Sequence, residues 1–564
     1  MISVSGRNWE QKRTNKNSVE KLKQDYNFSD IVSKLIISRN FDETELYSIN
    51  NDLNLNNVFL KNKDFEKSIQ IVIDVIKKKE KVCILGDYDV DGSVATSLFK
   101  RFFDSLKHPC FFYIPDRIID GYGASKELLK KLITKKPKLI IMVDCGSTSN
   151  EAINFLNKNN IKSLIIDHHE ISKPFPKANA IINPKKNNGY IDYNYFCATT
   201  LVYFFLDLLC KKINCKFKAS DFLIYILLAT VCDVMPIRKV NRLIAITALK
   251  NLNMNKNIAL NNLLNLNDRK VKLNLDDLGY LIGPILNSGG RLGKSSYATD
   301  LLSSDDLEFI NIKSKELIKL NDRRKKIEKL VLEEIDFHSI EKENKDIIVY
   351  FNPGINEGLI GIIAARLKDY FNKPAIVITQ SGEILKGSAR SVYNYNIGQA
   401  IMNSFDNKII IGGGGHSMAA GLTLQKKDLN DFKNFILKDF SKKKSTINNM
   451  FSYEAEISTQ ALNYDFYTDI KKLEPFGVGN PNPIFLFKDL KVIKIDILKN
   501  NHLSVILKSK IGFSIKSIFF NSTNNKVAKY LLNYKKTFNV LGQISENIWN
   551  NKKALQLTIH DLII

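Results

Sequence analysis

Several features that would fix a function class at once are missing from this 564-residue sequence. The seven cysteines form no CxxC pair and several lie in apolar runs, which favours buried thiols in a reducing compartment over a disulfide framework or zinc ribbon. The first residues lack the apolar core of a signal peptide. The longest apolar stretch, FLIYILLATVC at 222–232, is shorter than the roughly 18 residues of a membrane span. We therefore expect a cytoplasmic protein, and we find no internal repeats.

Acidic residues are in the minority, with 59 Asp and Glu against 83 Lys and Arg and a formal net charge of +24. This excess fits a solvated basic surface as well as a polyanionic partner such as a phosphodiester, and charge alone does not separate the two. A hydrophobic content of 44% is enough for ordinary cores, and the length predicts two to four domains.

The order of apolar segments predicts an α/β multidomain protein. From 80 to 170 short apolar runs alternate with helical patterns, as in a parallel, doubly wound sheet. Buried helices are expected at 200–232, a long charged helix at about 302–338 and a second α/β pattern from 346 to 421. The predicted divisions are an N-terminal helical segment at 1–45 packed on the next domain, a parallel-sheet domain at 46–270, a helical connector at 271–340, a second α/β domain at 341–445 and a small antiparallel β domain at 446–564.

Some of the acidic residues, together with two histidines, directly follow four apolar runs. The runs are CILGDYDVDG (83–92), LIIMVDCG (139–146), SLIIDHHE (163–170) and ILLATVCDV (226–234). Unpaired buried carboxylates cost several kcal/mol or give up their charge, so a cluster of them needs a cation. In a parallel sheet, ligands bind at the carboxyl ends of the strands, where these motifs are expected.

Each motif also has a plainer interpretation. Alternating carboxylates at Asp87, Asp89 and Asp91 suit hard cations, yet an Asp/Gly turn that caps a helix is common. A calcium loop of the EF-hand type is disfavoured, because the segment follows a strand and lacks the twelfth-position Glu. Asp144 alone is compatible with a helix cap, whereas two histidines beside Asp167 favour ligation or phosphate contact. Together with Asp233, the set fits a dinuclear Mn²⁺ or Mg²⁺ site.

The ordered motifs resemble those of the DHH phosphoesterases and, within them, the RecJ family of single-strand-specific exonucleases. The resemblance covers most of the chain. The motifs, in order, are GDYDVDG, PDRIIDGYG (115–123), VDCG, IIDHHE, TVCDVMP, GPILNSGGR (283–291), KGSARS (386–391), GGGGHSMAAG (412–421) and LEPFGVGNPNP (473–483).

The resemblance implies a role for each site residue. Asp89 and Asp91 would bind separate metals that Asp144 bridges, while His168 and Asp233 complete the shell of one metal. Four residues are implied in catalysis, Asp87 as a ligand or outer-shell base, His169 facing the substrate phosphate, and Arg291 and His416. Anion contacts are implied for Arg117, Arg291, Ser388 and Arg390, with Gly414, Gly415 and His416 contacting phosphate. Glycines at 412–415 would let backbone N–H groups approach an anion from a loop, ideally at a helix N-terminus.

Two positions depart from the family's usual sequence. Leu85 stands where many DHH proteins have a histidine, four residues before the first metal-binding Asp, and its side chain cannot ligate. This leaves the first metal to Asp87 or water, or to weaker binding. Asn356 stands where members often have the histidine of a Trp-His pair.

The resemblance implies a metal-dependent 5′→3′ exonuclease that degrades single-stranded DNA to nucleoside 5′-monophosphates in recombination and repair. The C-terminal β domain would be OB-fold-like, with Phe476, Phe485, Phe487 and Trp549 as stacking platforms unless they belong to the core. Single-stranded DNA is the expected partner of a monomer, and a helicase and a single-strand-binding protein are further expected partners. Two alternatives stay open, a small-substrate DHH phosphodiesterase acting on short RNA or cyclic dinucleotides, and a catalytically silent single-strand-binding scaffold.

Overall fold

The computed structural model falls into two compact units, which are described separately. The sheet unit comprises Leu55–Pro236 and Ile244–Ile447, and the barrel unit comprises Met1–Asn54, Ile237–Leu243 and Asn448–Ile564. The structure describes residues 1–117, 119–121, 123–186, 191–269, 273–343, 345–392, 395–443, 450–498, 502–510, 512–520, 525–533, 536–549 and 552–564. Within these ranges no helix is both long and apolar enough to cross a bilayer.

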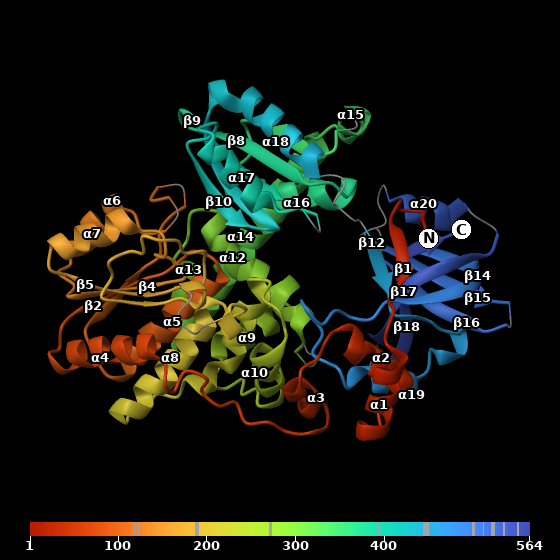
Figure 1. The fold of residues 1–564 in the computed structure, drawn as a ribbon, viewed down its shortest axis with the longest axis horizontal. Helices are drawn as coiled ribbons and strands as arrows, with labels where there is room; N and C mark the ends of the chain where they lie inside the picture. The colour runs from red at the N-terminus through yellow and green to blue at the C-terminus, as the bar shows by residue number, and fades with distance from the viewer. Residues whose placement is uncertain are drawn as a thin grey trace. The chain divides into compact units, whose positions relative to one another are not determined.

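The sheet unit begins with the predicted parallel sheet, whose five strands lie in the order β3-β2-β4-β5-β6. The strands are β2 (Val82–Leu85), β3 (Cys110–Tyr113), β4 (Leu139–Val143), β5 (Lys162–Ile166) and β6 (Ala180–Ile182). One face packs on α6 (Lys126–Ile133) and α7 (Asn150–Lys158), and the other on α4 (Lys63–Lys77), α5 (Val90–Ser105) and α8 (Ala198–Ile213) (Figure 1). Burial on both faces explains why the strands are apolar without alternation.

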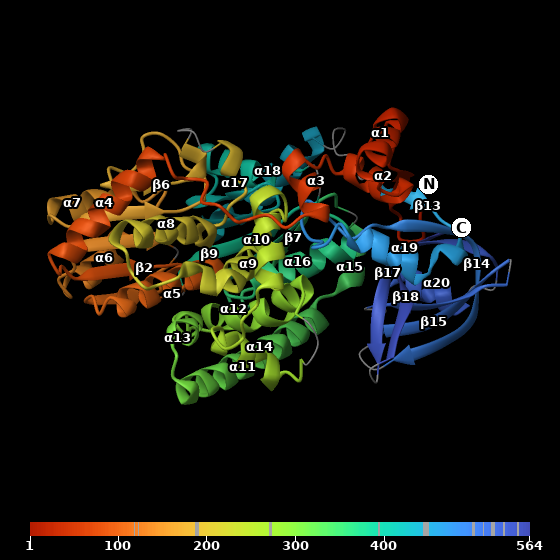
Figure 2. The same ribbon diagram turned by 90° about the horizontal axis from the view of Figure 1, so that it is seen from below.

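Helices follow the sheet, as the sequence predicts. They are α9 (Leu223–Cys232), α10 (Lys239–Lys250), α11 (Ile258–Leu266), α12 (Gly283–Arg291), α13 (Tyr297–Ser303), α14 (Leu307–Glu334) and α15 (Phe337–Glu343), with a π-helical turn at Asp277–Ile282. The long connector α14 packs against α11, α12 and α13 (Figure 2).

A second sheet of five strands, in the order β10-β11-β9-β8-β7, completes the sheet unit. Its elements are β7 (Ile348–Phe351), α16 (Ile360–Phe371), β8 (Ala375–Ser381), β9 (Ile384–Arg390), α17 (Ile397–Asp406), β10 (Gly412–His416), β11 (Ala419–Gln425) and α18 (Leu429–Lys443). The prediction of a glycine-rich loop at 412–415 is wrong, because these residues form strand β10 and pair with β11. A Cβ on Gly413 would lie 2.6 Å from Ile401 of α17, so a glycine here allows close packing of helix on strand.

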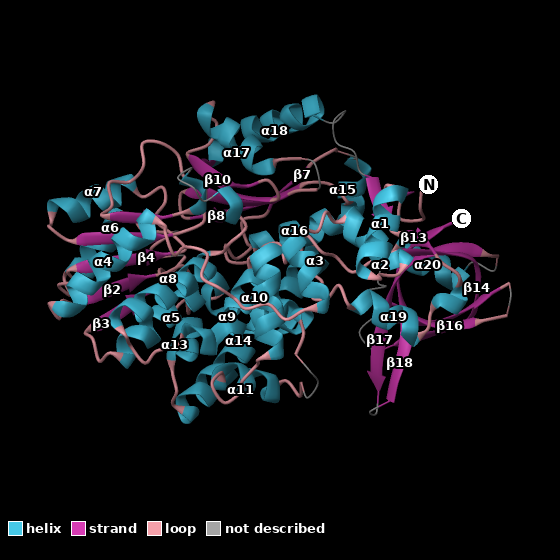
Figure 3. Ribbon diagram, turned by 60° about the horizontal axis from the view of Figure 1, so that its bottom comes forward, coloured by secondary structure: helices cyan, strands magenta, loops and turns pink. Residues whose placement is uncertain are grey.

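The barrel unit contains the predicted C-terminal β domain. Its strands β13 (Ala455–Glu456), β14 (Phe485–Leu498), β15 (His502–Ser509), β16 (Ser514–Phe519), β17 (Phe538–Trp549) and β18 (Lys552–Ile563) form one sheet that closes through pairing of β14 with β17 (Figure 3). Closure removes exposed strand edges. The helices α19 (Tyr464–Lys471) and α20 (Lys526–Asn533) accompany these strands.

The N-terminal segment belongs to the barrel unit, which corrects the prediction that it packs on the following domain. Its helices are α1 (Lys16–Tyr26), α2 (Asp30–Ser38) and α3 (Glu43–Asn50), and β1 (Asn8–Gln11) pairs in parallel with β12 (Met450–Tyr453). Val32 and Leu35 share one hydrophobic core with Leu490 and Val505. The amphipathic pattern of α2 predicts that its apolar face is buried. The pattern does not show which part of the chain covers that face.

Two of the expected stacking platforms are core residues. Phe485 and Phe487 are fully buried in the barrel core and are not available to a base. Phe476 is partly buried, and the Arg39 guanidinium lies 5.7 Å from its ring centroid. The side chain of Trp549 lies outside the described residues.

Candidate metal and phosphate site

The first three carboxylates lie where β2 meets α5. Asp89 caps α5, accepting a hydrogen bond of 3.0 Å from the Gly92 N–H. Asp91, in the first turn of α5, accepts hydrogen bonds of 2.7 and 2.8 Å from the N–H groups of Ala198 and Thr199 at the start of α8. The capping interpretation is therefore correct for Asp89, and capping and clustering of carboxylates occur together in this loop.

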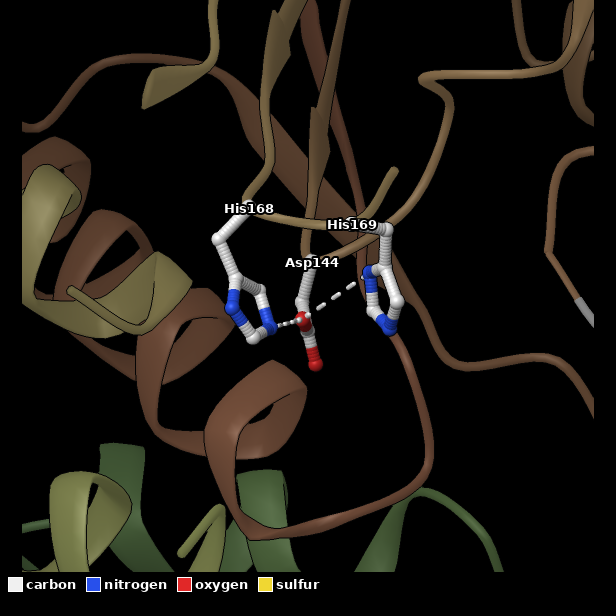
Figure 4. Close-up of side chains that lie close together, drawn as sticks. All are labelled: Asp144, His168 and His169. Atoms are coloured by element: carbon white, nitrogen blue, oxygen red, sulfur yellow. Dashed lines mark ion pairs between the residues drawn. The ribbon is translucent and has the colours of Figure 1, made fainter. Parts of the chain in front are cut away.

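Asp144 follows β4 with its backbone in the left-handed region, at φ +59°. Its N–H donates to the carbonyl of Ile166 at 3.0 Å, which fixes this conformation against β5. The Asp144 Oδ1 atom lies 3.3 Å from His168 Nε2 and 3.7 Å from His169 Nδ1, and Figure 4 shows Asp144 between the two imidazoles. Non-glycine residues at positive φ are uncommon and concentrate at functional sites.

Three overlapping groups of ligand atoms result. They are Asp87 with Asp89 and Asp144, Asp144 with His168 and His169, and Asp91 with His168 and Asp233, each with its ligand atoms within 4.8 Å of one another. In the third group, His168 Nε2 lies 3.4 Å from Asp233 and 3.8 Å from Asp91. The structure thus brings together all of the predicted metal ligands, with Asp144 shared between groups.

The chemistry of these atoms fits divalent cations. Four buried atoms have no hydrogen-bond partner among the described residues, namely Oδ1 of Asp87 and Asp144, Nε2 of His168 and Oδ2 of Asp233. Burial first, and then the neighbouring carboxylates, raises the pKa of Asp87, Asp144 and Asp233 well above the usual range. Such groups ionise together only when positive charge is placed among them. Mixed carboxylate and imidazole ligands suit Mn²⁺ and Mg²⁺.

His168 presents a neutral ring to this cluster. Burial lowers its pKa to about 4, despite the opposing charge of Asp91. A neutral imidazole keeps the nitrogen lone pair that a metal requires.

Asp167 positions His169 and was not among the predicted site residues. It accepts hydrogen bonds from the N–H groups of Ser147 and His168 and from His169 Nδ1, the last at 2.8 Å. Burial acts to lower the pKa of His169, but the hydrogen bond to Asp167 and nearby carboxylate charge raise it to about 9. The hydrogen bond to Asp167 therefore favours the protonated form of His169. The DHH motif, Asp167–His169, is the available signal in the sequence, because one histidine would bind metal and the other contact phosphate, which leaves the Asp to hold them in place.

The predicted anion contacts form an arginine cluster in the same unit. Burial and the charges of Arg117, Arg324 and Arg390 lower the pKa of Arg291 to about 10. Arg291 donates to the carbonyl of Gly358 at 3.0 Å and lines a cavity of about 200 Å³. Several cations held so close together favour an anionic ligand.

The remaining members of this cluster lie against Tyr88, which precedes α5, and against the start of α16. Arg117 lies over the Tyr88 ring at 5.5 Å, and Arg390 donates to Ser388 Oγ at 3.1 Å. A Cβ on Gly361, in the first turn of α16, would lie within 3.0 Å of both Arg390 and Ser388. The close approach places two predicted anion contacts at a helix N-terminus, which favours anions.

His416 joins the second sheet to the DHH motif. Its ring stacks on that of His169, with centroids 5.8 Å apart and planes at 24°. Burial, followed by the charges of Lys185 and His169, lowers the pKa of His416. Gly415 has φ +156°, and a Cβ there would lie 2.3 Å from the Ala419 carbonyl oxygen. Gly414 has no such constraint, since a Cβ there would meet only Met402, at 4.0 Å.

The two departures from the family's usual sequence have clear local roles. Leu85 is fully buried in the core beside α6 and α7. Asn356 Oδ1 accepts a hydrogen bond of 2.8 Å from the Gly358 N–H, in the turn whose Gly358 carbonyl binds Arg291. Asn356 therefore supports the arginine cluster through the backbone.

Comparisons with known proteins agree with this geometry. The sequence profile of the DHH family, N-terminal domain, matches residues 81–230, that of the DHHA1 domain matches 344–442, and that of the RecJ OB domain matches 453–561. The chain belongs to the RecJ family. Two solved structures of Thermus thermophilus RecJ are complexes with Mn²⁺ and with Mg²⁺, and the donor set described above fits such ions.

Relatives from several bacteria match nearly the whole chain. The single-stranded-DNA-specific exonuclease RecJ of Bacillus subtilis is 26% identical over 99% of this chain and 71% of its own length. The Haemophilus influenzae protein of the same name is 28% identical over 81% of this chain and 83% of its own length. The structure of Thermus thermophilus RecJ in complex with Mn²⁺ superposes with a TM-score of 0.83 at 20% identity, covering 98% of this chain and 79% of that one. The overall architecture is thus that of a RecJ protein.

Proposed function

We propose that this chain is a metal-dependent exonuclease that degrades single-stranded DNA from the 5′ end and releases nucleoside 5′-monophosphates. The observation that carries the proposal is the placement, in one unit, of a buried carboxylate–histidine cluster beside an arginine cluster. The first suits divalent cations and the second suits a terminal phosphate. A role in recombination and repair is consistent with the family.

In this proposal, Asp87, Asp89, Asp91, Asp144, His168 and Asp233 hold two divalent ions. Bound ions would supply the positive charge and Lewis acidity that phosphodiester hydrolysis needs at neutral pH. His169 contacts a phosphate oxygen, and Asp167 keeps its ring in place. Arg117, Arg291, Ser388 and Arg390 bind the 5′-terminal phosphate, which would set the direction of digestion.

Domain roles follow from the same proposal. Residues 46–270 would carry the metals and Arg117, and residues 271–340 would carry Arg291. Residues 341–445 would carry the other phosphate contacts, including Gly414, Gly415 and His416, and residues 446–564 a barrel that binds the strand. We expect a cytoplasmic monomer that uses strands opened by a helicase and meets single-strand-binding protein on them.

The test is a substrate panel with purified protein and Mn²⁺, with an EDTA control. The panel contains 5′- and 3′-labelled single strands, duplex DNA, dinucleotides and cyclic dinucleotides. Mononucleotide release from the 5′ ends of long single strands supports the proposal. Cleavage confined to dinucleotides or cyclic dinucleotides would instead show a small-substrate phosphodiesterase, and tight strand binding without cleavage would show a silent scaffold.

A further inference from the structure

One lysine outside the predicted site stands at its edge. Lys185 belongs to the short 3₁₀ turn Pro184–Lys186, which directly follows β6. Strand β6 pairs in parallel with β5, whose end carries the DHH motif. Lys185 therefore starts from the same sheet edge as His168 and His169.

The backbone of Lys185 is tied to the DHH motif through Asn183, which is fully buried. The Asn183 amide donates to the His169 carbonyl at 2.9 Å and to Ser147 Oγ at 2.7 Å. Its Oδ1 accepts from the Lys185 N–H at 2.8 Å. A buried amide with these partners holds them in a fixed geometry, so the backbone of Lys185 is fixed relative to that of His169.

The Lys185 ammonium is held by a weak partner. It lies 2.9 Å from Glu170 Oε1, and 70% of the Glu170 side chain is exposed to solvent against 22% for Lys185. Exposed ion pairs are worth about 0–1 kcal/mol, so exchange of Glu170 for another anion costs little.

The charge of Lys185 also acts on the site. Burial lowers the pKa of His416, and the Lys185 charge lowers it further. The Lys185 ammonium is therefore close enough to interact with His416, the histidine of the second sheet.

We infer that Lys185 is a catalytic contact that exchanges Glu170 for a non-bridging oxygen of the scissile phosphodiester when a strand is bound. The inference rests on the proposed function, because it requires a phosphodiester at the cluster. Its physical basis is that an ammonium forms short, charge-assisted hydrogen bonds with phosphate oxygens and stabilises charge that develops on them.

The test compares Lys185→Met and Lys185→Arg with the matched control Lys186→Met. Lys186 lies in the same turn but its ammonium pairs with Asp64, at 3.2 Å. Loss of one charge-assisted hydrogen bond predicts a kcat about ten- to a hundredfold lower for Lys185→Met with Mn²⁺ and single-stranded DNA. Lys185→Arg is expected to recover part of this loss, and Lys186→Met to retain wild-type kcat.

A second readout does not depend on turnover. In EDTA, loss of one phosphate contact is expected to reduce the slope of log affinity for single-stranded DNA against log salt by about 0.7 for Lys185→Met. Glu170→Gln frees the ammonium and is expected to bind the strand as tightly as wild type or more tightly. The inference is overturned if Lys185→Met matches Lys186→Met in both readouts, or if Glu170→Gln weakens binding as Lys185→Met does. Wild-type protein without nuclease activity would refute the proposed function, while the salt slope still tests Lys185.

Discussion

At the scale of single residues, Asp144 combines the features expected of a bridging ligand. Its carboxylate is shared by two of the three groups of ligand atoms, its Oδ1 has no hydrogen-bond partner among the described residues, and its backbone is left-handed. Burial and four neighbouring carboxylates raise its pKa. The Asp144 side chain should therefore destabilise the folded protein when metal is absent. When metal is bound, the same side chain should be required for cleavage.

Asp144→Asn is predicted to abolish cleavage while leaving single-strand binding in EDTA largely intact. Because asparagine tolerates positive φ and carries no charge, the metal-free variant should melt at a higher temperature than wild type. Its stabilisation by added Mn²⁺ should be smaller, since stabilisation grows with ligand affinity. Thermal melts with and without Mn²⁺ check both effects. Asp144→Ala also removes the carboxylate but tolerates the left-handed backbone less well, so comparison with Asp144→Asn gives the cost of that backbone conformation. Retained turnover would remove Asp144 from the bridging position.

At the scale of elements, the arginine cluster depends on how closely α12 approaches the turn that precedes α16. A Cβ on Gly358 would lie 2.2 Å from the Arg291 carbonyl oxygen, and Arg291 binds the Gly358 carbonyl in return. Neither contact involves the metal ligands. The clusters for metal and phosphate should therefore be separable by mutation.

Gly358→Ala is predicted to destabilise the sheet unit by about 1–3 kcal/mol through overpacking. Displaced Arg291 should raise KM for single-stranded DNA, while Mn²⁺ affinity stays at the wild-type value. Denaturant melts, steady-state kinetics and Mn²⁺ titration together measure these effects. Gly421→Ala is the control, because a Cβ there meets only the Gly387 carbonyl oxygen, at 4.0 Å. Equal KM for the two variants would contradict this account of Arg291.

A buried ion pair holds the segment Ile237–Leu243 within the barrel unit. Arg238 donates to both carboxylate oxygens of Glu45, at 2.6 and 2.7 Å, and Glu45 is 1% exposed. Burial acts to raise the pKa of Glu45, but hydrogen bonds from Arg238 and from the N–H groups of Lys239 and Asp42 outweigh it and lower the pKa. The stabilisation is fully present above the ordinary glutamate pKa of 4.5 and is lost as pH falls through the folded-state value.

Glu45→Gln is accordingly predicted to lower the stability of the barrel unit at pH 7 by about 1–3 kcal/mol, because Arg238 loses its charged partner. The difference from wild type should shrink below pH 4.5. Urea melts of both proteins between pH 3 and pH 7 measure it. A difference independent of pH would contradict the ionic origin of the stabilisation.

Elements with a local signal could be predicted from the sequence, and those defined by distant contacts could not. Apolar runs followed by carboxylates correctly predict a parallel sheet with the acids at one edge. The glycines of β10 are typical of a loop when the local sequence is considered alone. Their strand conformation depends on pairing with β11, which the local pattern does not contain. Lys185 and Asn183 belong to no recognisable sequence motif. Their position near the site follows only from the pairing of β6 with β5.

At the scale of the whole molecule, the two units are interleaved in sequence. The barrel unit draws on residues before 55, between 237 and 243, and after 447. Such assembly depends on contacts across more than 400 residues, for example β1 with β12, and composition gives no sign of them. The burial of Phe485 and Phe487 follows from the same closed barrel. The metal cluster is more predictable because each of its members lies shortly after a strand, in the first turn of the helix that follows it, or at the end of a helix, all within one unit.

The central claim is that the metal cluster digests a single strand from its 5′ end. The most direct measurement is the time course of digestion of one long single strand, labelled with radioactive phosphate at either its 5′ or its 3′ end, in Mn²⁺. We predict that labelled mononucleotide leaves the 5′-labelled strand from the earliest times, while the 3′-labelled strand shortens gradually, and that EDTA stops both. Early release of mononucleotide from the 3′ label, or equal digestion in EDTA, would contradict the account.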